Sequence, residues 1–272
     1  MGGGPAADDA EAADAAHCRA LVRAGDRDRF LAALFAPGRA RPHLNALAAF
    51  AVELGLVRAR VSEPMLARVR LQWWRDTLAE SAAGATIASP LADAVARAMR
   101  AHALPPALLE AMIDARESEL EGDAPETLTA FESHLDATEG ALIALGALIL
   151  TGRDLPDGAR RPAGLALGLT RALTRIATPA GARAALPRDL ASVHGPGGEE
   201  ALLADLTATA RHHLAAARTA LSGLPRVGLA AVLPLATIEG DLARLERRPF
   251  SGPSGPLARQ WAIWRAARRG RV

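Results

Sequence analysis

The stretch ALAAFAVELGLVRARVSEPMLARVRLQWWRD, residues 46–76, does most to decide the fold. Apolar side chains recur in it at every third or fourth position, the spacing that places them on one face of an α-helix. Ser62-Glu63-Pro64 interrupts the pattern, and serine is a preferred N-cap while proline fits the first turn of a helix. We therefore expect two long helices joined by a tight turn.

Helix is also the expectation for the rest of the chain. Of its 272 residues, 50% are hydrophobic but only 3% aromatic, because alanine and leucine, both strong helix formers, supply much of the apolar content. No window shows the period-2 alternation of β-branched residues that predicts a strand. The sequence predicts an all-α, single-domain helical bundle over residues 9–272, preceded by a disordered tail over residues 1–8.

Proline, glycine and capping residues set the expected boundaries of the other helices. We expect helices over residues 9–23, 26–37, 89–102, 105–122, 125–150, 160–177, 199–222, 225–247 and 255–269. Residues 177–190, ATPAGARAALPRDL, contain two prolines and a glycine and are expected to form turns.

Charge and cysteine usage exclude several classes of protein. The basic side chains are all arginine rather than lysine, and the net charge of +2 does not argue for nucleic-acid binding. The single cysteine, Cys18, precludes an internal disulfide and a cysteine-based metal site. The longest apolar run, residues 141–150, is too short to span a bilayer, and the N-terminus lacks the features of a signal peptide. A cytoplasmic location is therefore expected.

Seven segments resemble the squalene/phytoene synthase family, in the order that the family has them. They are DRDRFLAALFAP (26–37), ALAAFAVELGLVRARVSEP (46–64), RLQWWRD (70–76), FESHLDATEGALIAL (131–145), LALGLTRALTRIATPAGARAALPRDL (165–190), VLPLATIEGDLARLERRPF (232–250) and LARQWAIWRAARRG (257–270). The resemblance covers about residues 26–269 and implies a fold of the isoprenoid (terpenoid) synthase type.

The chain departs from the chemistry that this resemblance implies. In the family's enzymes, two Asp-rich boxes on facing helices hold Mg²⁺, which binds the diphosphate leaving group as two prenyl diphosphates are joined head to head. Here the first box falls on Gly55–Ala59 and the second within Leu173–Pro179, and no acid occurs from Gly158 to Arg188. We therefore predict no catalytic residue, cofactor or metal ligand, with Mg²⁺ only if carboxylates elsewhere rebuild the site.

The segments VELGLVRARVSEP, RLQWWRD and RQWAIWRAARRG are most similar to a branch of the family that lacks the boxes, which comprises the complex I assembly factor of mitochondria and its bacterial relatives. The leading hypothesis is a catalytically degenerate member that acts as an assembly or interaction factor, with a subunit or assembly intermediate of respiratory complex I as partner. Two alternatives stay open. One is an active head-to-head prenyl transferase with relocated Mg²⁺-binding carboxylates, and the other is a metal-free binder of an isoprenoid or lipid.

Arginines near the former boxes would repel Mg²⁺ but are suited to bind an anionic headgroup. Together with a neighbouring tryptophan, they define a candidate anion or lipid pocket formed by Arg58, Trp74, Arg75, Arg171, Arg175 and Arg183. The alternative interpretation places the arginines on solvated helix faces and the tryptophan in the core.

The last predicted helix combines tryptophan with arginine. Trp261 and Trp264 lie near one stripe of it and arginines surround them, so Trp261, Trp264, Arg265 and Arg268 are candidates for contact with a partner or, at the inner membrane face, with lipid. The alternative is a tryptophan stripe that packs on the bundle.

One acidic stripe also needs an interpretation. Glu132, Asp136 and Glu139 share a face of the helix predicted over residues 125–150. Three carboxylates on one face can bind a metal, but we prefer a solvated acidic stripe, because no second acidic helix faces it at the family positions.

Overall fold

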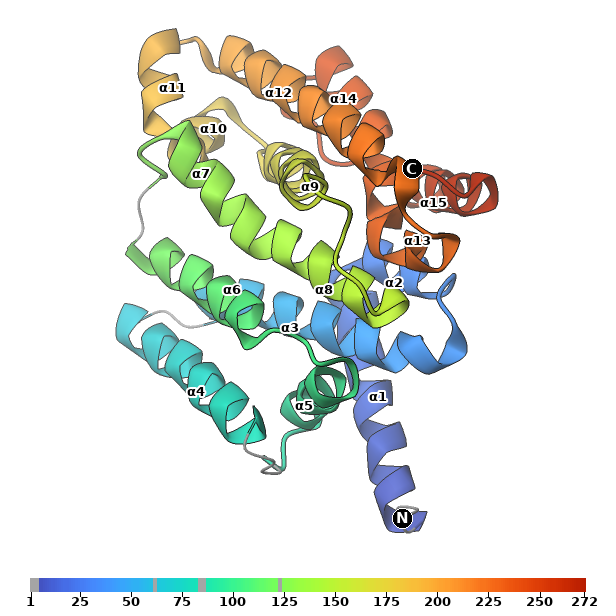
Figure 1. Ribbon diagram of the computed structural model, residues 1–272. Helices are drawn as coiled ribbons and strands as arrows, with labels where there is room; N and C mark the ends of the chain where they lie inside the picture. The colour runs from blue at the N-terminus through green and yellow to red at the C-terminus, as the bar shows by residue number, and fades with distance from the viewer. Residues whose placement is uncertain (1–4, 61–62, 83–86, 122–123) are drawn as a thin grey trace.

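A computed structural model describes residues 5–60, 63–82, 87–121 and 124–272, and all the regular elements of these residues are helical. Figure 1 shows their arrangement. The α-helices are α1 (Pro5–Gly25), α2 (Arg27–Ala33), α3 (Arg41–Arg60), α4 (Pro64–Ala82), α5 (Pro90–His102), α6 (Pro106–Ser118), α7 (Leu128–Leu135), α8 (Ala141–Thr151), α9 (Arg160–Arg175), α10 (Pro179–Ala185), α11 (Arg188–His194), α12 (Glu199–Ala220), α13 (Leu229–Val232), α14 (Ile238–Arg247) and α15 (Pro256–Arg269). The all-α prediction is confirmed.

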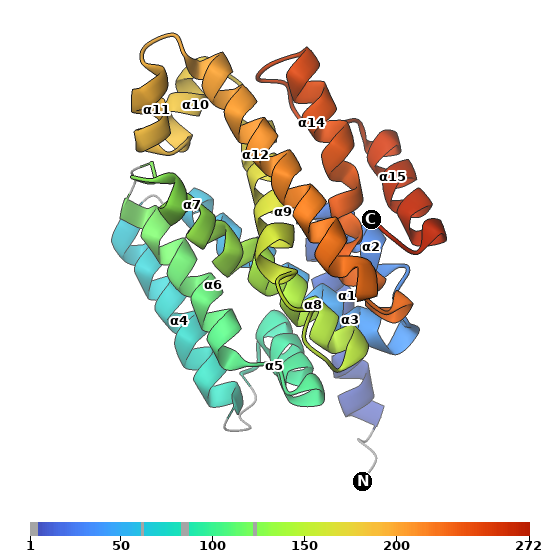
Figure 2. The ribbon, with the colours of Figure 1, turned by 45° about the horizontal axis from the view of Figure 1, so that its top comes forward.

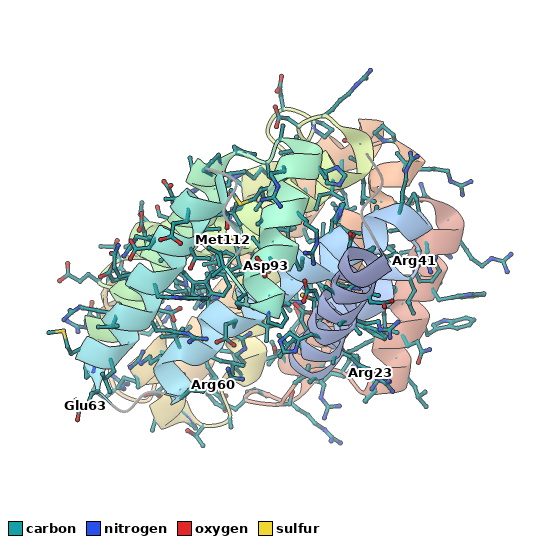
Figure 3. All side chains as sticks on the ribbon, turned by 90° about the horizontal axis from the view of Figure 1, so that it is seen from below. Arg23, Arg41, Arg60, Glu63, Asp93 and Met112 are labelled. Atoms are coloured by element: carbon teal, nitrogen blue, oxygen red, sulfur yellow. The ribbon has the colours of Figure 1, made fainter. Side chains whose placement is uncertain are left out.

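The two central helices form as the hydrophobic pattern predicts, as α3 and α4. In Figure 3, α3 runs from Arg41 at one end to Arg60 at the other. Glu63, labelled near Arg60, is the residue before α4. Pro64 is the first residue of α4, whereas the predicted N-cap Ser62 lies outside the described residues. Of the tail predicted to be disordered, residues 1–4 also lie outside them, and residues 5–8 belong to α1.

Two segments differ from the prediction. Residues 177–190 form the short helices α10 and α11 instead of turns, because the Thr178 hydroxyl accepts a hydrogen bond from the Gly181 amide (3.1 Å) and caps α10. The single helix expected over residues 225–247 is divided into α13, a 3₁₀ segment (Leu233–Thr237) and α14. Pro234 lies in that segment, where it has no amide hydrogen to continue an α-helix.

The long helix predicted over residues 125–150 is observed with a π-helical turn, Asp136–Gly140, between α7 and α8. This turn packs against α9 at unusually close range, since an ideal Cβ built on Gly164 would lie 2.6 Å from the Gly140 Cα atom. Only glycine at position 164 permits that approach. The π turn is the feature that carries Glu139, the carboxylate at the centre of the site described below.

The span Leu128–Thr151 contains an 18-residue window with a mean hydropathy of 1.3, and it is long and apolar enough to cross a membrane by length and composition. In the bundle, however, α8 packs against α3, α6, α9 and α13, and 56% of the apolar window is buried. Figures 1 and 2 show α7 and α8 lying between α6 and α9. The segment is therefore a core helix.

Two large hydrophobic clusters form most of the core, and a third, smaller one fastens α15. The first surrounds α3, where Phe50, Leu54 and Leu71 are buried with Trp74, and the second lies between α9 and α12. Burying a side chain such as leucine or phenylalanine contributes about 1.5–3 kcal/mol, so these clusters dominate stability. The cavity described next is lined by Leu54, Met112 and Leu142 of the first cluster.

Candidate functional site

A cavity of about 640 Å³ opens between α2, α3, α6, the π turn and α9. Its apolar wall includes Leu54, Leu56, Met112 and Leu142. Six arginines and three carboxylates form its polar wall, namely Arg27, Arg29, Arg116, Arg171, Arg175, Arg259, Asp26, Asp28 and Glu139. The lining of the cavity thus combines apolar side chains with many arginines.

The positions of both former Asp-rich boxes line this one cavity. Gly55 and Leu56 of the first box lie on α3, and Thr174 and Arg175 of the second lie at the end of α9. The two predicted box positions therefore meet at one cavity, and glycine, leucine, threonine and arginine line it at these positions instead of carboxylates.

Asp26, Arg29, Glu139 and Arg171 form a closed ring of ion pairs at the polar wall. Arg29 binds Asp26 at 2.7 Å and Glu139 at 2.6 Å. Arg171 binds Asp26 at 2.9 Å and Glu139 at 3.1 Å. The side chains of all four residues are only 10–16% exposed. We call these four residues the buried ion-pair ring. It ties α2 to the π turn and to α9, because Asp26 is also the N-cap of α2.

The ring holds both carboxylates in the ionised form. Burial by itself raises the pKa of Asp26 and of Glu139, but the guanidinium groups of Arg171 and Arg29 outweigh burial and keep each pKa below its ordinary value. Burial likewise lowers the pKa of Arg171, and the two carboxylates outweigh it, so the net direction is upward. The ring therefore stays charged and paired at neutral pH.

The polar wall does not fit the Mg²⁺ cluster of the family's enzymes. Mg²⁺ needs free, hard carboxylate oxygens in near-octahedral geometry, whereas those of Asp26 and Glu139 already accept hydrogen bonds from arginine. A metal would have to displace buried guanidinium groups and then lie beside their charge. Within the described residues, no group of three or more His, Cys, Asp or Glu side chains is arranged to hold a metal ion.

Two arginines of the cavity, Arg27 and Arg175, form no ion pair with the described residues. The pKa of Arg175 lies below its ordinary value, chiefly because of burial. Glu139 acts in the opposite direction, and the neighbouring guanidinium groups of Arg171 and Arg116 add to the lowering. Arg116 is paired with Glu119 at 2.6 Å. Arg175 is therefore a cation at the cavity wall whose charge the described carboxylates do not fully compensate.

A second ion-pair cluster borders the cavity. Arg259 of α15 binds Asp28 of α2 and Asp241 of α14, and both carboxylates are buried. Asp241 also accepts a hydrogen bond from the Ser254 amide at 2.7 Å. This cluster joins α2, near the start of the chain, to the consecutive helices α14 and α15, so its role is to fasten α15 to the body of the protein.

Of the six residues predicted to form the pocket, the structure brings Arg171 and Arg175 together at the cavity and places the other four elsewhere. Arg58 is exposed, because the cavity is lined by α3 only as far as Leu56. Trp74 is buried in the core, with its ring centroid 4.9 Å from that of Phe50. The structure thus favours the core interpretation for this tryptophan.

The remaining two predicted residues are engaged on other helices. Arg75 binds Asp114 at 2.6 Å and Glu117 at 2.5 Å, both on α6, because it projects from the side of α4 that faces α6. Arg183 binds Glu199 and donates to the Gly195 carbonyl at 3.0 Å, which fastens α10 to the start of α12. Neither residue lines the cavity.

The acidic stripe is not solvated, so our preferred interpretation of it is wrong. Glu132 binds Arg161 at 2.8 Å, Asp136 binds Arg160 at 2.8 Å, and Glu139 belongs to the buried ion-pair ring. Their side chains are 13–18% exposed. The reason is that α9, which carries the three arginines, packs directly on this face.

No direct signal in the sequence pointed to the most buried residues of the site. Asp26 meets Arg171 across 145 positions of the chain, and Asp28 meets Arg259 across 231. The one local sign is the run Asp26-Arg27-Asp28-Arg29, in which charges alternate at the start of a helix. Such a run is usual on a solvated surface, so only the packing of α2 reveals its role.

A model of the squalene/phytoene synthase family matches residues 22–265, and the chain therefore belongs to that family. Two solved structures share its fold. A dehydrosqualene synthase is 15% identical with a TM-score of 0.82, covering 95% of this chain and 97% of that one. A squalene synthase from Alicyclobacillus acidocaldarius is 20% identical with a TM-score of 0.74, covering 88% and 95%.

Relatives that are similar in sequence are named as assembly factors and not as synthases. The protein named NADH dehydrogenase (ubiquinone) complex I, assembly factor 6, from Homo sapiens is 28% identical over 249 residues, which is 86% of this chain and 74% of the human protein. Its counterpart from Bos taurus is 29% identical over the same shares of the two chains.

Proposed function

We propose that this protein is a catalytically degenerate member of the family that serves as an interaction factor in the assembly of respiratory complex I. The observation that carries the proposal is the likeness, over 86% of the chain, to mammalian proteins named complex I assembly factor 6. The buried ion-pair ring supports it, because arginines engage the carboxylates of the cavity that a metal would need.

A deletion strain tests the assembly role. We expect loss of the gene to lower NADH:quinone oxidoreductase activity in isolated membranes, with less of the full-sized complex on native gels. The gene restored on a plasmid should reverse both effects. A deletion strain with normal activity and a normal amount of complex would overturn the proposal.

A turnover assay tests the degenerate chemistry separately. Purified protein is mixed with farnesyl or geranylgeranyl diphosphate and Mg²⁺, and released pyrophosphate is measured. We expect no release above the rate without protein. Robust release that a chelator abolishes would mean that carboxylates elsewhere rebuild a metal site, and it would favour the prenyl transferase alternative.

The shape of the cavity supports a second candidate function, metal-free binding of an isoprenoid or lipid. Leu54, Met112 and Leu142 offer an apolar wall, and Arg175 offers a cation that forms no ion pair with the described residues. Arginine binds phosphate oxygens well without a metal. This arrangement favours a binder over a relocated metal enzyme, although carboxylates do face the cavity, each in an ion pair.

Calorimetry in the presence of a chelator tests this second function. We expect geranylgeranyl diphosphate to bind the purified protein, and Arg175→Ala to weaken the affinity about tenfold, since one charge-assisted contact is lost. The matched control is Arg161→Ala, which changes an arginine of the same helix that does not line the cavity. Equal affinities for the two variants, or no binding by the natural protein, would contradict it.

A further inference from the structure

The outward face of α15 carries large apolar side chains. Leu257 is 82% exposed, Trp261 is 58% exposed and Trp264 is 38% exposed. The opposite face is buried through Ile263 and Ala266. The alternative in which the tryptophan stripe packs on the bundle is therefore wrong, and the helix turns its aromatic side away from the core.

The tryptophans form one continuous exposed surface. The rings of Trp261 and Trp264 stack with centroids 4.7 Å apart at an angle of 24°. The guanidinium of Arg268 lies over the Trp264 ring, 5.1 Å from its centroid. We call these three residues with Leu257 and Arg265 the α15 outer face.

This face is held rigidly. Arg259, on the inner side of the helix, is fastened to Asp28 and Asp241, while Ile263 and Ala266 pack against Ala32 and Leu233. Figure 2 shows α15 at the margin of the bundle beside α14. An exposed aromatic surface on a firmly anchored helix indicates a docking surface rather than a loosely packed end.

The segment that carries the α15 outer face has charged side chains of one sign. Residues 256–272 contain no Asp or Glu, and Arg265, Arg268, Arg269 and Arg271 are all exposed. Three of these arginines also line a neighbouring groove of about 630 Å³, whose apolar floor includes Leu221, Leu224, Leu229 and Val232. The one acidic side chain that lines this groove, Glu239, is already paired with Arg218.

We propose that the α15 outer face docks onto a membrane surface that contains anionic phospholipids. Indole rings prefer the boundary between headgroups and acyl chains, where their apolar bodies are buried and their N–H groups stay hydrated. Arginines beside them reach phosphate oxygens, and the absence of acidic residues from the segment removes the repulsion that a partly acidic helix would meet. The groove gives a headgroup and the first part of an acyl chain a place beside the helix.

This inference goes beyond the assembly role and does not depend on it. An anionic bilayer is the occupant that the charge favours, because a protein partner of ordinary composition presents charges of both signs. The α4 surface around Met65 and Leu66 is also exposed, but Arg60 and Arg70 beside it are paired with Glu53, so it lacks the single sign of charge.

Co-sedimentation of the full chain with vesicles tests the proposal. We expect binding to vesicles that contain phosphatidylglycerol, weaker binding to vesicles of phosphatidylcholine alone, and weaker binding at high salt, since screening shortens the range of the arginine charges. Trp261→Ser combined with Trp264→Ser should lower the partition coefficient about tenfold or more, because two indole rings leave the interface. Arg265→Gln combined with Arg268→Gln should lower it by a similar factor on anionic vesicles.

Matched controls come from the opposite side of the molecule. Met65→Ser combined with Leu66→Ser removes exposed apolar side chains from α4, and Arg58→Gln combined with Arg68→Gln removes exposed arginines. Both should bind vesicles as the natural protein does, and unchanged circular dichroism melting shows that each variant folds. The proposal is overturned if the natural protein does not bind anionic vesicles, or if the α15 variants bind as well as the controls.

Discussion

The cavity and the α15 outer face use the same residue, arginine, in opposite ways. At the cavity, Arg29 and Arg171 are nearly buried and each contacts two carboxylates. On α15, Arg265 and Arg268 are exposed, and residues 256–272 supply no acid to pair with them. A count of arginines therefore says little about function, because the partner of each side chain decides whether that arginine stabilises the fold or is available to bind a ligand.

Removal of one cation from the buried ion-pair ring should have the largest effect. Arg171→Met leaves Asp26 and Glu139 short of a partner, and breaking a buried pair in this way costs about 3–5 kcal/mol. Urea unfolding of the two proteins measures the difference. Arg161→Met is the matched control on the same helix, because its 48% exposed side chain should cost less than about 1 kcal/mol. An equal loss of unfolding free energy in the two variants would contradict the distinction between buried and exposed ion pairs.

The second largest effect on stability is expected from acid, which should weaken the buried ion-pair ring. Asp26 and Glu139 have folded-state pKa values below their ordinary values of 3.8 and 4.5. At a pH between the folded-state pKa and the ordinary pKa of each carboxyl, the unfolded chain binds more protons than the folded one. The stability that the ring contributes is therefore complete above the ordinary pKa values and is lost as the pH falls through the folded-state pKa values. Urea unfolding from about pH 7 to about pH 3 should show falling stability. In Arg171→Met the acid-dependent part should shrink, and an unchanged slope would place its origin elsewhere.

Arg175 is an arginine of the cavity that should contribute little to stability. It forms no ion pair with the described residues, so Arg175→Ala should change the free energy of unfolding by less than about 0.5 kcal/mol, far less than Arg171→Met. Thermal unfolding of the two variants side by side checks this. A loss as large as that of Arg171→Met would show that Arg175 belongs to the structural ring and is not available to a ligand.

The smallest effect on stability is expected on α15. Arg265→Gln combined with Arg268→Gln should leave the free energy of unfolding unchanged within about 0.5 kcal/mol, since both side chains are exposed. The same variant should lose binding to anionic vesicles. If thermal unfolding instead shows a clear loss of stability, these arginines hold the helix in place, and the contrast between the two regions fails.

The helices and the location of the site follow largely from local pattern. The apolar spacing of residues 46–76 predicts α3 and α4, and Pro90 and Pro106 mark the starts of α5 and α6. Residues from both predicted box positions line one cavity. These features could be predicted because helix formation and capping depend on residues within a few positions of one another.

The partners of the charged side chains could not be predicted in this way. Glu139 looks like one of three solvated acids until the π turn and the close contact at Gly164 bring α9 against it. Arg183 follows the pattern of the family's segment yet pairs with Glu199, because α10 packs on α12 and not on the cavity. In each case the deciding contact comes from another helix.

Composition and helical periodicity were enough to predict an all-α bundle, and the resemblance to the squalene/phytoene synthase family implied the fold type and the replacement of both Asp-rich boxes. The packing of distant helices, by contrast, makes Trp74 1% exposed and Trp261 58% exposed, although both lie on helices. It also decided that Asp26 and Glu139 belong to one ring with Arg29 and Arg171. The physical reason is that burial and ion pairing depend on which faces of distant helices meet, and helical periodicity does not encode that choice.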